Sequence, residues 1–156
     1  MARKGTPEIE QDIYDALEIF FGVPSDGSGS GSGSGQPDER PIRGALYQEG
    51  CRPLDSKAED AVITVSTAGG GQIQEGKAKV NIYVPDIDNG SGLPVPDKGR
   101  IQELSALGEA VIQALNDADT DYEFTLDPAP KDYVNHENKQ HFVSIGIAFQ
   151  RITFNQ

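Results

Sequence analysis

The stretch that most constrains the fold is 72–86, which reads QIQEGKAKVNIYVPD. From Ala78 onward apolar and polar residues alternate, the period-two pattern of a strand that buries one of its faces. Pro85 has no amide hydrogen to donate to a neighbouring strand, so the strand is expected to end there. We therefore expect a central antiparallel strand in this part of the chain.

Two segments have the spacing of amphipathic helices, 7–22 and 100–116. The first is preceded by a possible cap at Thr6, has a proline in its first turn, and is followed by Gly22, a residue suited to a helix C-terminus. The second is the more amphipathic, and we expect it to lie across the sheet and hold the strands together. The residues expected to face the core are Ile9, Ile13, Ala16, Leu17 and Phe20 in the first helix, and Ile101, Leu104, Leu107, Gly108, Val111, Ile112 and Leu115 in the second.

The remaining strands are predicted from β-branched or alternating runs. They are expected at 42–50, 61–67, 122–126 and 140–154, with a polar loop over 127–138. The run 61–67 is followed by three glycines and should form a hairpin with the central strand. The order α-β-β-β-α-β-β predicts an α+β fold, a two-layer sandwich in which two helices cover one face of an antiparallel sheet of four to five strands.

The length of 156 residues indicates a single domain, 1–156. Residues 27–35 read GSGSGSGSG, which behaves as a flexible coil and resembles an artificial linker. Two origins are compatible with it: it replaces a native loop, or it joins helix 7–22 to the domain 42–154.

The net charge of −12 argues against a protein that grips nucleic-acid phosphates, because such binding relies on Lys and Arg. The single cysteine, Cys51, cannot form an intrachain disulfide, and no run of apolar residues is long enough for a membrane helix. A soluble protein made in a reducing cytoplasm is the expectation.

We find no motif for catalysis, cofactor binding or metal binding. The neighbours Glu59 and Asp60 resemble a carboxylate pair, but adjacent residues of an extended chain point to opposite sides, so salt links or a subunit contact are favoured. The loop DIDNGSG at 86–92 resembles a calcium loop without its distal Glu, and His136 and His141 have no further ligands nearby in sequence. The sequence predicts no cofactor and no metal.

Two phrases carry a family resemblance: RP-x-DS-x-x-ED at 52–60 and QIQEG-x-x-x-VNIYVPD at 72–86. Together with the second helix and the final strand, they make residues 42–154 resemble phage and prophage proteins of Bacteroides-type bacteria. That group looks related to the tail terminator, tail completion and head-tail joining proteins of long-tailed phages.

The resemblance implies a non-enzymatic virion structural protein that forms a ring, commonly a hexamer, and caps the tail tube at the head-tail interface. Its partners would be further copies of itself, tail tube proteins and head-connector proteins, and DNA would pass through an acidic lumen without specific binding. The polar segment 72–76 is expected to be an exposed arm or an extension of the strand, and to touch a neighbour. The candidate subunit interface comprises Arg52, Asp55, Ser56, Glu59, Asp60, Gln72, Gln74 and Glu75.

Two other classes of function remain open on the sequence. One is a small metal-dependent hydrolase or nuclease that uses the acids of its loops, Glu59 with Asp60 and Asp86 with Asp88. The other is a peptide-binding module in which the tethered helix 7–22 occupies a groove on 42–154.

Overall fold

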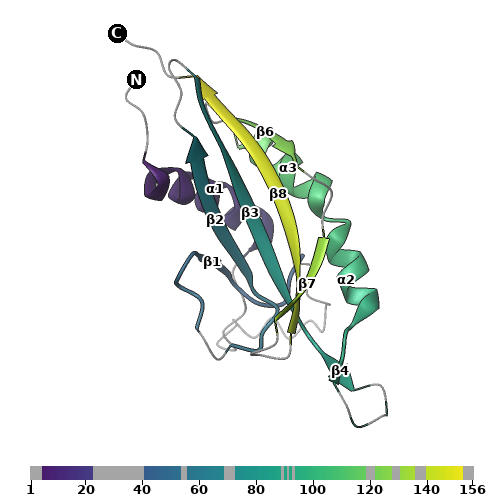
Figure 1. Ribbon diagram of the computed structural model, residues 1–156. Helices are drawn as coiled ribbons and strands as arrows, with labels where there is room; N and C mark the ends of the chain where they lie inside the picture. The colour runs from purple at the N-terminus through teal and green to yellow at the C-terminus, as the bar shows by residue number, and fades with distance from the viewer. Residues whose placement is uncertain are drawn as a thin grey trace, which may run out of the picture.

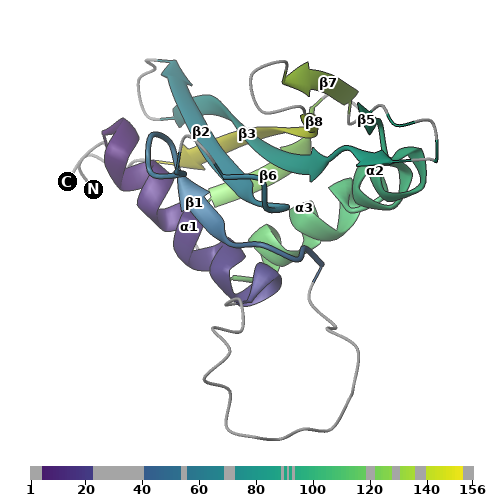
Figure 2. The same cartoon turned by 90° about the horizontal axis from the view of Figure 1, so that it is seen from below.

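The fold is α+β, as predicted: a mixed sheet carries its helices on one face (Figures 1 and 2). It is seen in a computed structural model. The structure describes residues 5–22, 41–53, 56–68, 73–88, 90, 92, 94–118, 122–127, 131–135 and 140–152. The linker at 27–35 therefore lies outside the described residues, as do Asp55, Gln72 and His136.

Helix α1 (Thr6–Phe21) matches the predicted N-terminal helix. Its N-cap is Gly5 rather than Thr6, and Gly22 ends it with φ 75° and an N–H that donates to the carbonyl of Glu18 at 2.8 Å. One side of the helix is buried in the core, so α1 is an integral layer of the fold. Ile9, Ile13, Leu17 and Phe21 are all 0% exposed. Phe20, predicted as a core residue, is half-buried and packs against the edge of the core.

The second predicted helix is two helices, α2 (Lys98–Ser105) and α3 (Gly108–Asp117). At the junction the N–H of Leu107 donates to the carbonyl of Leu104, a tight three-residue turn that ends α2, and α3 then starts at the buried Gly108. Glycine is less favourable in a helix than any residue except proline, which favours a break at this point. Asp97 caps α2 by accepting from the N–H of Arg100 at 3.2 Å.

The centre of the sheet is a long antiparallel pair, β3 (Ile73–Pro85) and β8 (Gln140–Ile152). Strand β2 (Ala61–Ala68) forms the predicted hairpin with β3, and β6 (Tyr122–Leu126) pairs with β8 on the other side. The core lies between β2, β3 and β8 and the helices. Its buried strand residues include Ile63, Ala78, Val80, Ile82, Val84, Val143, Ile145 and Ile147.

Three details of the predicted sheet are wrong. The first strand, predicted over 42–50, is only β1 (Leu46–Gln48), and it pairs with β2 in parallel. A parallel pair needs a long crossover, which residues 49–60 supply. The predicted loop 127–138 contains β7 (Lys131–Asn135), which pairs with β8 beyond β6. Residues 86–99, for which no strand was predicted, contain a short pair, β4 (Ile87–Asp88) and β5 (Pro94–Val95).

Of the two expectations for the segment 72–76, an exposed arm or an extension of the strand, the structure shows the strand extension in its described residues. From Ile73 onward it belongs to β3, where Glu75 and Gly76 lie between β2 and β8. The side of β3 that carries Gln74 faces the helices, and Gln74 is only 2% exposed. The polarity of Gln74 did not keep it out of the core, because it lies opposite the equally buried Arg151 of β8, so the core is polar at this end.

Candidate functional site

The most concentrated chemistry of the chain is a group of charged side chains at the start of β2. Glu59 and Asp60 directly precede this strand, and both carboxylate side chains are 3% exposed. Because the backbone is extended here, the two point to opposite sides, and each meets a different arginine. We call Arg52, Ser56, Glu59, Asp60 and Arg100 the buried charge cluster.

Glu59 is bound by Arg100 of α2. The guanidinium donates to both carboxylate oxygens, with Nε–Oε2 at 2.8 Å and a second nitrogen to Oε1 at 2.5 Å. The N–H of Arg43 donates to Oε1 as well, at 3.0 Å. The hydrogen bonds that Arg100 donates to Glu59 raise the pKa of Arg100 above its ordinary value, in spite of partial burial. A bidentate ion pair of this kind holds both side chains in one geometry.

Asp60 is bound by Arg52 on the other side of the strand. Arg52 Nε lies 3.1 Å from Oδ2, and the Ser56 hydroxyl donates to the same oxygen at 2.6 Å. The N–H of Ala45 donates to Oδ1 at 2.9 Å. The guanidinium of Arg52 also lies over the ring of Tyr83, 4.1 Å from its centroid.

Arg52 also makes hydrogen bonds to three further groups inside the fold. One terminal nitrogen donates to the carbonyls of Ser56 and Ala58, each at 3.2 Å, and to Gln140 Oε1 at 3.1 Å. The cluster therefore ties residues 41–60 to β2, to β8 and to α2. Buried charges are tolerated only when they are paired and hydrogen-bonded, and both acids meet that condition.

The buried charge cluster gives the described polar residues of the motif RP-x-DS-x-x-ED a structural role within the fold. Four candidate interface residues, Arg52, Ser56, Glu59 and Asp60, bind one another or other residues of the same chain. The salt-link alternative for Glu59 and Asp60 is what the structure shows. The assignment of Glu59 and Asp60 to a subunit interface is wrong, because their carboxylates are buried within one subunit. Sequence reasoning missed Arg100, whose partner is 41 residues away in the chain.

The remaining interface candidates separate in the structure. Gln74 is buried on the helix-covered side, whereas Glu75 is exposed on the opposite side. That opposite side carries no described helix and is called the open face (Figure 2). Register assigns it Val62, Thr64, Ser66, Glu75, Lys77, Lys79, Asn81, Tyr83, Phe142, Ser144, Gly146, Ala148, Gln150, Glu123 and Thr125.

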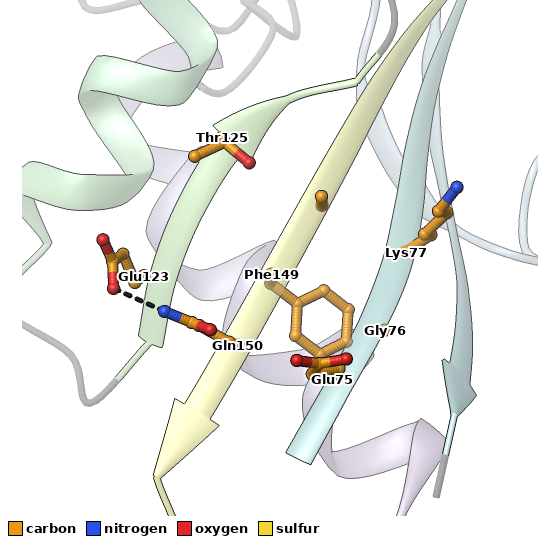
Figure 3. A pocket seen from close by; sticks show the side chains of 8 residues that line it. Glu75, Gly76, Lys77, Glu123, Thr125, Phe149 and Gln150 are labelled. Atoms are coloured by element: carbon orange, nitrogen blue, oxygen red, sulfur yellow. Dashed lines mark hydrogen bonds between the residues drawn. The ribbon is translucent and has the colours of Figure 1, made fainter. Parts of the chain in front are cut away.

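A shallow groove of about 380 Å³ lies on the open face between β3, β8 and β6 (Figure 3). Ala148 of β8 lies between its two sides, which carry Glu75 and Lys77 of β3 on one and Glu123 and Thr125 of β6 on the other. Its charged groups are partly paired: Gln150 donates to Glu123 at 2.7 Å (Figure 3), and Lys77 lies 3.2 Å from Asp127. The groove is open and of mixed charge, as in a contact surface.

Beneath this groove Gly76 lies against the ring of Phe149. A side chain at Gly76 would collide with the ring and with the carbonyl of Ser66. The glycine therefore makes room for Phe149, which packs with Tyr122 and Phe124 in an aromatic group under the sheet.

Two of the residues considered for a metal, His141 and Asp86, bind each other. His141 Nδ1 lies 2.8 Å from Asp86 Oδ1 in the partly buried end of the sheet, so the first acid of the supposed calcium loop is bound to a histidine. Among the residues that the structure describes, no group of three His, Cys, Asp or Glu side chains could hold a metal ion.

The outer edge of β6 is covered by a side chain. Asn116 of α3 donates to the carbonyl of Phe124 and accepts from its N–H, both at 3.0 Å. The amide thus makes the two hydrogen bonds that a neighbouring strand would make.

Replacing Asn116 by Ala is expected to lower the free energy of unfolding by about 1–3 kcal/mol, because both groups of Phe124 lose their partner. Chemical denaturation measures the change. Gln113→Ala on the same helix removes only an exposed contact with Asp117, so it should change stability by less than about 0.5 kcal/mol. Equal effects of the two variants would contradict the role of Asn116.

No protein-family model and no curated protein matches the chain. Within the part of the chain that the structure describes, no helix is both long and apolar enough to span a membrane.

Proposed function

We propose that the chain is a structural subunit of a phage particle, a tail terminator or tail completion protein that assembles into a ring at the head-tail interface. The observation that carries the proposal is the division of the molecule's polar groups. The charged side chains of Arg52, Glu59 and Asp60 form their hydrogen bonds within the fold. The open face and two strand edges therefore remain for contacts with other chains.

The charge distribution supports passage of DNA without specific binding. The open face carries Lys77 and Lys79 together with Glu75 and Glu123, so both signs are present and no basic stripe forms among the described residues. The chain as a whole has a net charge of −12. A ring lined by such a surface would repel DNA weakly or would not bind it.

The geometry gives little support to a hydrolase or nuclease. Each carboxylate of Glu59 and Asp60 already accepts hydrogen bonds from an arginine and from a backbone N–H. A general base needs an oxygen within reach of a substrate proton, and these oxygens are buried and occupied. Tail proteins of the tube and the head connector are the partners that the proposal implies, and the virion tail is the location.

Electron microscopy in negative stain tests the proposal. Purified protein is expected to give rings with a central hole, and rings added to tail tubes should bind at tube ends. Compact single particles without a hole, at concentrations where the protein is fully folded, would contradict it.

A further inference from the structure

The outer edge of β2 is only partly paired. Strand β1 covers Ala61, Val62 and Ile63, and no described strand pairs with that edge from Thr64 to Ala68. The N–H of Ala61 donates to the carbonyl of Ala45, toward this edge. Because hydrogen-bonding direction alternates along a strand, Val65 and Thr67 direct their amide and carbonyl groups to the same side. Four backbone groups therefore point outward from the end of the sheet.

The other end of the sheet has a matching edge on β7. The N–H of Asp127 donates to the carbonyl of Gly146, so Gly146 and, by alternation, Ser144, Phe142 and Gln140 direct their backbone groups toward β6 and β7. Their partners in β7 are Lys131, Tyr133 and Asn135. Asp132 and Val134 therefore direct their groups outward, where the described residues contain no further strand.

We propose that the edge Thr64–Ala68 of one copy pairs with β7 of the next copy, so that one sheet continues around the ring. The register places Val65 opposite Val134 and Thr67 opposite Asp132, which pairs all outward backbone groups of both edges. Ser66 then lies opposite Tyr133. The inference rests on the proposed function, since it names the surface through which the ring closes.

The strand directions agree with this pairing. Strand β3 is antiparallel to β2, β8 is antiparallel to β3, and β7 is antiparallel to β8. Strand β7 of the next copy therefore runs antiparallel to β2 when the sheet continues. The contact uses two different edges of the same subunit, the arrangement from which closed rings are built.

The stagger of the two edges also fits closure. Through the sheet Ser66 aligns with Lys77 and then Ala148, whereas Tyr133 aligns with Phe142, six residues earlier on β8. At about 3.3 Å per residue, six residues give an offset of about 20 Å along the strand direction. The repeat of four strands, spaced about 4.8 Å apart, is about 19 Å wide. The strands would tilt by about 45° from the ring axis, close to the tilt of closed barrels, which is about 35–45°.

The composition of the β2 edge favours a strand partner. Thr64–Ala68 contains no charged residue, in a chain of which 24% is charged. Free edges in monomeric proteins are normally protected by charges, prolines or covering side chains, as Asn116 covers β6. Two copies that each carry −12 meet with least repulsion through an uncharged strand.

Disulfide cross-linking tests the register. In a Cys51→Ser background, which removes the exposed native thiol, Ser66→Cys and Tyr133→Cys are combined in one chain. Opposed residues that do not exchange hydrogen bonds lie about 4.5 Å apart at Cα, within the range of a disulfide. Mild oxidation should give a ladder of covalent oligomers that ends at the ring size on a non-reducing gel. The pair Thr64→Cys with Tyr133→Cys, displaced by two residues, should cross-link at least about tenfold less.

The controls separate this inference from the proposed function. Ser66→Cys alone should stay monomeric on the gel, and efficient dimers would show that β2 meets β2 about a two-fold axis, which overturns the inference. Light scattering of the unmodified protein reports the assembly independently. Rings without a ladder would overturn the β2–β7 contact and leave the proposed function standing, whereas a monomer at every concentration would contradict both.

Discussion

Replacing Arg100 by Met is expected to lower the free energy of unfolding by about 3 kcal/mol, because the carboxylate of Glu59 stays buried without its cation. The expected cost lies at the lower end of the range of about 3–5 kcal/mol for such changes, since the Arg100 side chain retains 15% exposure to water. Domains have a stability of about 5–15 kcal/mol, so the loss would be a large part of the total. Urea denaturation followed by circular dichroism measures it.

Two further variants show whether the effect comes from the buried charge. Glu103→Gln removes the other carboxylate bound to Arg100, which is 69% exposed, and should cost less than about 1 kcal/mol. The double variant Glu59→Met with Arg100→Met removes both charges and should recover much of the stability. An Arg100→Met variant as stable as Glu103→Gln would show that Glu59 is not held as described.

Replacing Gly44 by Ala is expected to cost about 1–3 kcal/mol, with the upper end favoured. A Cβ at this position would collide with Asp60 Oδ1 and with the backbone carbonyl of Glu59. Backbone cannot move aside as a flexible side chain can, and displacing Asp60 would weaken its pair with Arg52. Thermal or chemical denaturation of the variant gives the magnitude.

Gly99→Ala is the matched control for this substitution. Gly99 lies in α2, and a Cβ there has its nearest neighbour, Asp97 Oδ1, at 4.0 Å. Alanine is the better helix residue, so this variant should gain about 0.4–1 kcal/mol. If Gly44→Ala were neutral or stabilising too, the close approach of Gly44 to the buried charge cluster would be disproved.

The sequence predicted those parts of the fold that depend on local pattern. Alternation in 61–67 and 78–84 with glycines between them specifies the β2–β3 hairpin, and the spacing of Ile9, Ile13 and Leu17 specifies α1. The break between α2 and α3 was missed because the apolar positions continue on both sides of Leu107. Gly108 alone is too weak a signal to locate a break.

The remaining errors concern one short strand and the pairing of residues distant in the chain. The parallel pairing of β1 depends on the path of residues 49–60, which no local pattern encodes. Strand β7 was read as loop because KDYVN lies between prolines and polar residues. Asp60 is bound by Arg52 and Ser56 of its own segment, but the partner of Glu59 could not be read from that segment, since Arg100 comes from elsewhere in the chain.

The mass of the unmodified protein in solution tests the central claim most directly. Sedimentation velocity, run over a wide range of concentrations in reducing buffer, should show one closed species whose mass is a fixed multiple of the 16.7 kDa chain. A single species of 16.7 kDa at every concentration would contradict the claim that this protein functions as the subunit of a ring.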